Sequence, residues 1–250
     1  MTGFDLRGRT ALVTGASGGL GAHFARTLAA HGAAVILAAR RTGALAAVAE
    51  QIHAEGGECR ALELNVADEA SIAGAAPELR GVDILVNNAG IARGATALRL
   101  AAEDWDAVVD TNLKGAFLLS QLSARAMRER GSGGSIINIA SILGLRQAPG
   151  VLPYAVSKAG LIQMTRVLAL EWARYGIRVN AIAPGYFATE NNAEFFAGSA
   201  GKAMLERIPQ QRLGRFAELD GPLLLLASPL SSYMTGATIE VDGGHLASPL

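Results

Sequence analysis

The sequence predicts an α/β fold in which one doubly wound parallel sheet is covered by helices on both faces. Short runs of Val, Ile, Leu and Ala recur along the chain without period-2 alternation, as is typical of strands buried on both faces. Helical patterns separate these runs, which indicates parallel strands joined by crossover helices. A glycine-rich turn joins the first run to the first helical pattern.

The elements follow this alternation from one end of the chain to the other. The first strand, Thr10–Thr14, is an apolar run that ends at the glycine turn, and a helical pattern follows at 19–31. A strand at 33–38 and a helix at 43–55 repeat the unit. The later apolar runs predict strands at 60–64, 82–86, 135–140, 179–183 and Thr238–Val241, and the two longest helical patterns occupy 102–130 and 154–175.

No linker, charge block or low-complexity tract divides the 250 residues, so we expect a single domain over residues 1–250. Residues 188–214 have little strand character and contain small residues at 198–201, which suggests a mobile substrate flap over a site.

Composition limits the partners of this chain. The formal net charge is +0, so nothing favours nucleic acid or an anionic membrane. Cys59 is the only cysteine, which excludes an internal disulfide, and no Cys/His cluster has zinc spacing, so we expect no metal. Residues 1–8 are polar, unlike a signal peptide, and the longest apolar runs are far too short to span a bilayer. These features predict a cytoplasmic protein.

The glycine turn has the sequence Thr14-Gly15-Ala16-Ser17-Gly18-Gly19-Leu20-Gly21. Glycines there permit a tight turn and a close approach of the backbone, while the following helix N-terminus favours a pyrophosphate. The spacing is G-x-x-x-G-x-G instead of the commoner G-x-G-x-x-G. The turn could serve chain geometry alone, but its place between a strand and a helix favours a dinucleotide site.

Tyr154 and Lys158 are four residues apart in a helical pattern, so they share one face of the helix. A neighbouring ammonium favours the phenolate and is expected to lower the Tyr154 pKa, as a proton-transfer residue requires. Ser141 follows the strand at 135–140, where such sheets place ligands, and its hydroxyl can bond the same substrate oxygen as Tyr154. Chance also produces Y-x-x-x-K in amphipathic helices, so this pair indicates a catalytic site only together with Ser141 and the glycine-rich turn.

These motifs together resemble the short-chain dehydrogenase/reductase family over nearly the whole chain, in order and in approximate spacing. The resemblance implies a Rossmann-type fold and a 3-oxoacyl reductase-like or carbonyl reductase-like member that exchanges hydride between a nicotinamide and a carbonyl or hydroxyl carbon. The residues that carry it are Gly15, Gly19, Gly21, Asn87-Asn88-Ala89-Gly90, Asn112, Ser141, Tyr154, Lys158 and Pro184-Gly185.

The resemblance also implies roles for individual residues. Asn112 would support a proton-relaying water near Lys158, and this role is favoured over the alternative of a helix-kinking or buried polar residue. Asn65-Val66 stands where the family often has Asp-Val beside the adenine, and Asn can still accept a hydrogen bond there. The expected cofactor-binding residues are Gly15, Ser17, Gly19, Leu20, Gly21, Arg40, Arg41, Asn65, Val66, Asn88, Ala89, Gly90, Tyr154, Lys158, Pro184, Gly185, Phe187 and Thr189.

The end of the second strand predicts a preference for NADP(H), with NAD(H) possible. NAD-preferring members place an acidic residue there, which binds the 2′-hydroxyl of the adenosine ribose, whereas this chain has Ala39 followed by Arg40 and Arg41. NADP carries a phosphate at that 2′ position. A guanidinium can bind this phosphate bidentately, and Ser17 could add a hydroxyl donor. The alternative is that both arginines are solvated loop charges.

The predicted function is an NADP(H)-dependent carbonyl reductase or alcohol dehydrogenase acting on a small molecule. The alternatives are an NAD-dependent secondary alcohol or polyol dehydrogenase and a non-catalytic dinucleotide-binding regulator. The scattered histidines, His245 among them, predict no site of their own. The helices at 102–130 and 154–175 have long apolar stripes. The resemblance implies that these helices pair across subunits in a homotetramer, with the segment 241–250 at a second interface. The expected substrate-facing residues are Ser141, Leu143, Gln147, Val151, Tyr154 and Tyr186.

Overall fold

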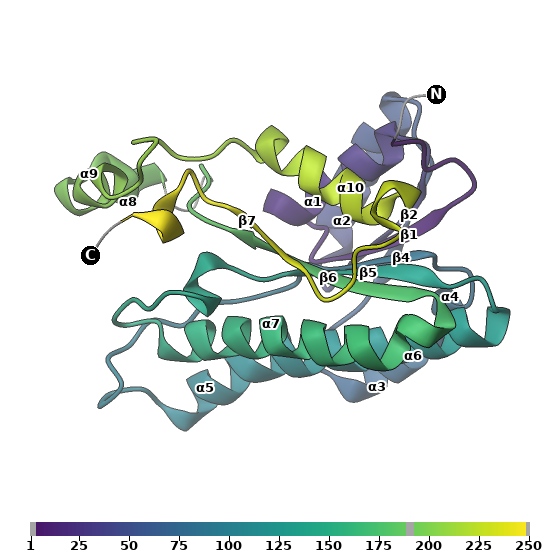
Figure 1. The fold of residues 1–250 in the computed structure, drawn as a ribbon, viewed down its shortest axis with the longest axis horizontal. Coiled ribbons are helices and arrows are strands. Elements are labelled where there is room, and N and C mark those ends of the chain that lie inside the picture. Colours follow the sequence, from purple (N-terminus) through teal and green to yellow (C-terminus); the bar gives the residue numbers. More distant parts are fainter. Residues whose placement is uncertain (1–3, 189–192, 249–250) are drawn as a thin grey trace.

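A computed structural model of the chain describes residues 4–188 and 193–248. Its centre is one seven-stranded parallel sheet with helices on both faces (Figure 1), which confirms the predicted fold class. The sheet has the order β3-β2-β1-β4-β5-β6-β7. The strands are β1 (Thr10–Thr14), β2 (Ala34–Ala39), β3 (Cys59–Glu63), β4 (Ile84–Asn87), β5 (Gly134–Ile139), β6 (Ile177–Pro184) and β7 (Thr238–Val241).

Two helical layers enclose the sheet. One layer contains α1 (Gly19–Ala30), α2 (Thr42–Ala54) and α10 (Asp220–Ala227), and the opposite layer is dominated by α6 (Gly115–Arg130) and α7 (Leu152–Trp172) (Figure 1). The shorter helices α3 (Glu69–Gly74), α4 (Ala76–Leu79) and α5 (Ala102–Val109) belong to the second layer. The inner strands of the sheet feed both cores; in β1, for example, Ala11 and Val13 pack on one side and Leu12 on the other. Burial on both faces explains why these inner strands read as continuous apolar runs.

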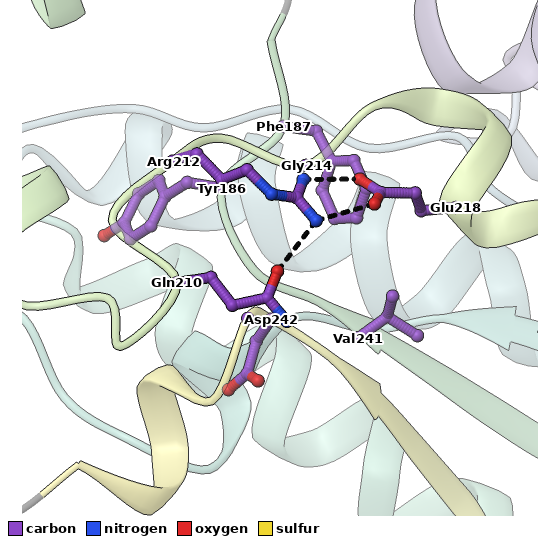
Figure 2. Close-up of a pocket in the computed structure, with 9 residues that line it drawn as sticks. Tyr186, Phe187, Gln210, Arg212, Gly214, Glu218, Val241 and Asp242 are labelled. Carbon is purple, nitrogen blue, oxygen red and sulfur yellow. Dashed lines mark hydrogen bonds and ion pairs between the residues drawn. The ribbon is translucent and has the colours of Figure 1, made fainter.

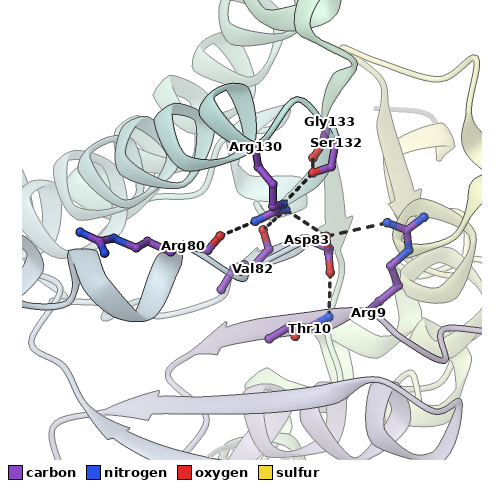
Figure 3. A network of polar contacts seen from close by, with 8 residues as sticks. All are labelled: Arg9, Thr10, Arg80, Val82, Asp83, Arg130, Ser132 and Gly133. Carbon is purple, nitrogen blue, oxygen red and sulfur yellow. Dashed lines mark hydrogen bonds and ion pairs between the residues drawn. The ribbon is translucent and has the colours of Figure 1, made fainter.

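The strand order reverses between β1 and β4, because the chain runs outward to β3 before it returns. Asp83 fixes this junction at the amino ends of the two strands (Figure 3): its carboxylate accepts a hydrogen bond from the Thr10 backbone and pairs with Arg130, each at 3.0 Å. Arg130 also donates to the carbonyl of Val82 at 3.0 Å. The opposite, carboxyl ends of β1 and β4 are the topological switch point at which such sheets bind ligands.

The helix predicted at 102–130 is wrong in one respect, because a π-helical turn at Asp110–Lys114 separates α5 from α6. The turn contains the buried Asn112, whose side chain bonds to a distant backbone segment. At the start of α6, Gly115 approaches the Val66 carbonyl so closely that an added Cβ would lie 2.1 Å from its oxygen. The helical periodicity is therefore interrupted by tertiary contacts.

The predicted flap contains two short helices, α8 (Ala193–Ala197) and α9 (Ser199–Glu206). Its returning end is tied to the sheet, because the Gly214 backbone donates to the Tyr186 carbonyl at 2.9 Å and Gln210 donates to Gly243 at 3.2 Å. In Figure 1 these helices lie at the same end of the molecule as the C-terminal segment. That the segment moves over a site stays a prediction. In the described part of the chain, no helix is long and apolar enough to cross a membrane.

Candidate active site

The glycine turn lies at the switch point and takes a shape that side chains would prevent. Gly15 has a φ of +67°, in the left-handed region that favours glycine. A Cβ on Gly21 would lie 2.2 Å from the Gly15 carbonyl oxygen. Asn88, just past the end of β4, braces the turn by donating from its side chain to the Thr14 carbonyl at 2.9 Å. The backbone of α1 is thereby brought close to the strand ends, as a pyrophosphate site requires.

A groove of about 740 Å³ runs from this turn along the ends of the first strands. It brings together the first twelve residues predicted to bind the cofactor, from Gly15 to Gly90. It also includes residues that the sequence did not single out as contacts. The lining consists of Gly15, Ser17, Gly18, Gly19, Leu20, Gly21, Ala39, Arg40, Arg41, Leu64, Asn65, Val66, Asn88, Ala89, Gly90, Ile91 and Thr111.

The groove has a basic end after β2. Arg40 and Arg41 are exposed there, and Arg41 donates to the Ser17 hydroxyl at 3.1 Å. No acidic side chain lines the groove within the described residues. Two guanidiniums and a hydroxyl at the end of β2 suit a phosphate better than a bare ribose hydroxyl, because charge-assisted bonds to phosphate are strong.

A second pocket, of about 250 Å³, continues from the groove and shares Leu20, Asn88 and Gly90 with it. It lies at the carboxyl ends of β5 and β6, beside the first turn of α7. The predicted catalytic residues Ser141, Tyr154 and Lys158 meet here. The lining consists of Leu20, Asn88, Gly90, Ile139, Ala140, Ser141, Tyr154, Lys158, Pro184, Gly185, Tyr186 and Phe187.

Burial sets the proton affinities of Tyr154 and Lys158. It raises the pKa of the Tyr154 phenol, while a hydrogen bond with Ser141 lowers it and the nearby Tyr186 raises it. Burial lowers the pKa of Lys158 to about 8. The expectation that Lys158 lowers the Tyr154 pKa is therefore wrong for this structure. The Lys158 ammonium donates to the Ile139 carbonyl at 2.7 Å and lies 5.6 Å from the centre of the Tyr154 ring.

Ser141 is placed by the end of β5 and by the short 3₁₀ turn that follows it. Its hydroxyl oxygen accepts a hydrogen bond from the Leu143 backbone at 3.1 Å, so the side chain caps that turn. Gly144, in the same turn, packs directly on α7, where an added Cβ would lie 2.7 Å from the Lys158 backbone. This close packing holds Ser141 beside Tyr154.

Asn112 is buried, and three structural hydrogen bonds hold its side chain. Its side chain exchanges two bonds with the Ile91 backbone, at 2.8 and 2.9 Å, and donates to the Ser157 hydroxyl at 3.1 Å. An added Cβ on Gly90 would lie 3.3 Å from the Asn112 oxygen and 3.5 Å from the Lys158 nitrogen. The structure thus places Asn112 near Lys158 and ties it to the loop after β4 and to α7.

Some predicted contacts are absent from these two pockets. Leu143 and Gln147 do not line the second pocket, and their contact with a substrate stays a prediction. Thr189 lies outside the described residues. Sequence reasoning missed the side chain of His245, whose ring packs against that of Tyr186. In the described chain, no group of three or more His, Cys, Asp or Glu side chains could hold a metal.

A third, smaller cavity of about 110 Å³ lies on the other side of Tyr186 and Phe187, between the flap end and the turn after β7 (Figure 2). Arg212 bridges this region, because its guanidinium pairs with Glu218 and donates to the Gln210 side chain, both at 2.7 Å. The base of the flap is therefore held by side chains as well as by backbone bonds.

Comparison with known proteins places this geometry in context. The sequence profile described as enoyl-(acyl carrier protein) reductase matches residues 15–245. The chain is 41% identical over 253 residues to 2-dehydro-3-deoxy-D-gluconate 5-dehydrogenase of Dickeya dadantii, with 98% of each chain covered. It is 42% identical over 245 residues to a 3-oxoacyl-[acyl-carrier-protein] reductase of Synechocystis, with 96% of this chain and 97% of the relative covered.

A solved structure has the same fold over nearly the whole length of this chain. The crystal structure of a gluconate 5-dehydrogenase from Burkholderia cenocepacia, in complex with NADP and tartrate, superposes with a TM-score of 0.94 at 38% identity. The match covers 99% of this chain and 98% of that one.

Proposed function

Because this chain belongs to the short-chain dehydrogenase/reductase family, we propose that it is an oxidoreductase that exchanges a hydride between NADP(H) and a carbonyl or secondary alcohol carbon. The observation that carries this proposal is the continuity of two pockets. A long glycine-lined groove with a basic end opens into a small pocket that holds Ser141, Tyr154 and Lys158. This arrangement suits a dinucleotide whose reactive end meets a proton donor.

The groove fits the cofactor by shape and charge. The glycine turn, open to close approach of the backbone at Gly15 and Gly21, would hold the pyrophosphate. Arg40, Arg41 and Ser17 would hold the 2′-phosphate, and Lys158 the nicotinamide ribose. When bound, the nicotinamide supplies or accepts the hydride.

The side chains of the second pocket would then transfer the proton that accompanies the hydride. In the reducing direction, the raised pKa of Tyr154 keeps its phenol protonated at neutral pH, so it can donate that proton to the substrate oxygen. Ser141 donates a second hydrogen bond to the same oxygen and stabilises the charge that develops there. Lys158, with a pKa of about 8, can return a proton to Tyr154 near neutral pH. Asn112 acts on this relay by fixing the loop that carries Gly90.

Other functions fit the structure less well. A dinucleotide-binding regulator needs no Ser-Tyr-Lys set in a pocket that joins its cofactor groove. An NAD-dependent polyol dehydrogenase remains the second candidate, and it differs only in what the basic end of the groove binds. Some relatives are named for gluconate derivatives and others for 3-oxoacyl thioesters. Each of these substrates contains a ketone or a secondary alcohol.

Assembly belongs to the same proposal. The outer faces of α6 and α7 enclose an exposed hollow of about 630 Å³, lined in part by Phe117, Met164, Val167 and Trp172. We expect these faces to pair in a homotetramer, and we expect the enzyme to act in the cytoplasm. The second predicted interface includes residues 249–250, which lie outside the described residues.

Cofactor choice tests the proposal directly. We expect wild type to prefer NADPH in kcat/KM. Replacing Arg40 or Arg41 by Ala should lower kcat/KM for NADPH by about ten- to a hundredfold, because a charged phosphate contact is lost, and should leave NADH nearly unchanged. Arg60→Ala serves as a matched control, because Arg60 is an exposed arginine of β3 that pairs with Glu78 of α4. An equal loss with both cofactors, or a wild type that favours NADH, would overturn the NADP assignment.

A further inference from the structure

A cavity of about 150 Å³ lies at the amino ends of the strands, on the edge of the sheet opposite the groove and the second pocket. Residues at the starts of β1, β4, β5 and β6 line it, together with the segment that follows α10. Its charged lining residues are Arg9, Asp83 and Arg178. The proposed hydride exchange uses none of them, so this cavity is separate from the candidate active site.

Arg178, the second residue of β6, brings a charge to this cavity without a carboxylate beside it. Its guanidinium is partly buried and donates to the Ser231 hydroxyl at 2.7 Å and to the carbonyls of Leu226 and Ser228 at 2.9 and 3.3 Å. All three acceptors are neutral, and no acidic side chain of the described chain pairs with Arg178. Burial lowers the pKa of this guanidinium, yet an arginine stays charged at neutral pH.

These three bonds hold the Arg178 guanidinium in place. Leu226 belongs to the last turn of α10 and Ser228 follows that helix, so Arg178 satisfies carbonyls at the helix end. A guanidinium has five N–H groups, and this role uses three of them. The other two have no partner in the described chain, and Arg178 lines the cavity in which a ligand would meet them.

The other charges around the cavity do not cancel that of Arg178 (Figure 3). Asp83 is the one acidic residue among the described residues of the lining. Its carboxylate already pairs with Arg130 at 3.0 Å and lies 3.8 Å from the exposed Arg9. Three guanidiniums therefore surround a single carboxylate, which leaves two positive charges in excess. Excess positive charge in a partly enclosed site attracts an anion.

We propose that this cavity binds a phosphate group, either inorganic phosphate or the phosphate of a small monoester, with Arg9 and Arg178 as its charged partners. A phosphate group carries nearly two negative charges at neutral pH, which matches the excess, whereas a carboxylate carries one. Guanidiniums also bind phosphate oxygens in pairs. The bound group would join the segment before β1 to β6 and to the end of α10. This site does not depend on the proposed function.

Calorimetric titration with inorganic phosphate tests the site, in a phosphate-free buffer of low ionic strength. The protein is saturated with NADPH, so that the cofactor covers Arg40 and Arg41. We expect saturable binding of one phosphate. Arg178→Gln and Arg9→Gln should each weaken it at least tenfold, because each removes a charged contact. A second titration uses glycerol 3-phosphate: tighter binding than inorganic phosphate identifies a monoester as the ligand, and weaker binding identifies the free ion.

Ser132 separates binding from folding, because Arg178→Gln also removes the bonds to α10. Ser132 is exposed, lines the cavity, and accepts a hydrogen bond from Arg130 at 2.8 Å. Ser132→Asp keeps an acceptor for Arg130 but adds a negative charge, so it should weaken phosphate binding at least tenfold without lowering the unfolding temperature. Ser132→Asn, similar in size and neutral, should bind phosphate within threefold of wild type.

The control outside the cavity is Arg60→Gln, which removes another exposed arginine and should leave the affinity for phosphate unchanged. Absence of saturable phosphate binding to wild type would overturn the inference. Affinities of Arg178→Gln and Ser132→Asp that stay within threefold of wild type would do the same. A loss in Arg178→Gln without any loss in Ser132→Asp would also overturn it, because Arg178 would then act only by capping α10.

Discussion

Tyr154 and Lys158 lie one helical turn apart, and burial shifts their pKa values in opposite directions. It raises the pKa of the phenol and lowers that of the ammonium to about 8. Near neutral pH the phenol is therefore protonated and neutral, while the ammonium is still mostly charged but loses its proton more easily than an ordinary lysine, which suits a group that passes a proton to Tyr154. Ser141 moderates the shift at Tyr154 through its hydrogen bond.

The depressed pKa of Lys158 makes stability depend on pH. Below pH 8 the folded protein holds a buried charge, whereas between pH 8 and 10.5 the folded amine is neutral and the unfolded chain still binds the proton. The free energy of unfolding of wild type, relative to Lys158→Met, should therefore rise with pH across this window, by on the order of 3 kcal/mol. Guanidinium denaturation of both proteins from pH 7 to 10 checks this. A difference that stays flat or falls would show that Lys158 keeps an ordinary pKa.

At the scale of elements, the turn between β1 and α1 depends on glycine because chain segments meet there. An added Cβ on Gly21 would collide with the Gly15 carbonyl, whereas one on Gly43, in the first turn of α2, meets no atom within 4 Å. The turn and the side chain of Asn88 therefore form one rigid unit under the groove.

The two glycines offer a matched experiment. Gly21→Ala should weaken NADPH binding at least tenfold, because relieving the clash moves the backbone that holds the pyrophosphate. Gly43→Ala should bind NADPH as wild type does and be slightly more stable, since Ala has the better helix propensity. Fluorescence titration of NADPH measures both. Near-equal affinities for the two variants would mean that the glycine spacing does not shape the site.

Local sequence patterns predicted the strands to within a few residues, because each is an apolar run with polar or glycine boundaries. They predicted one continuous helix at 102–130, with a kink at Asn112 only as an alternative, whereas the structure has a π-helical turn there. The Asn112 side chain in this turn forms two hydrogen bonds with Ile91, 21 residues away in the chain. They also did not predict α10, whose Leu-rich run shows no amphipathic period because several of its side chains are buried. Such elements depend on contacts between residues that are far apart in the sequence, so a short stretch of sequence does not predict them.

At the scale of the whole molecule, the strand order assembles the site. The twelve residues predicted for the groove lie along the carboxyl ends of β3, β2, β1 and β4, because parallel strands end at one edge of the sheet. The contact between Arg41 and Ser17, and the stacking of His245 on Tyr186, could not be predicted in this way. They depend on side-chain directions and on the return of the C-terminal segment past the flap.

The outer faces of α6 and α7 predict association. Wild type should sediment as a particle of four times the 25.8 kDa chain. Val167→Asp should shift it to smaller species, because Val167 lines the apolar hollow and is 43% exposed in one chain. Leu98→Asp, at a fully exposed loop position, is the control and should leave the sedimentation unchanged. A monomeric wild type, or a Val167→Asp protein that remains a tetramer, would contradict this assembly.

The central claim is that Tyr154 transfers the proton that accompanies hydride exchange. Single-turnover oxidation of bound NADPH by an accepted ketone, followed at 340 nm, tests it in Tyr154→Phe, with Tyr233→Phe as a fully exposed control. The account predicts a rate lower by about 10²–10⁴-fold in Tyr154→Phe, with NADPH affinity nearly retained and the control unchanged. A rate within tenfold of wild type would contradict it.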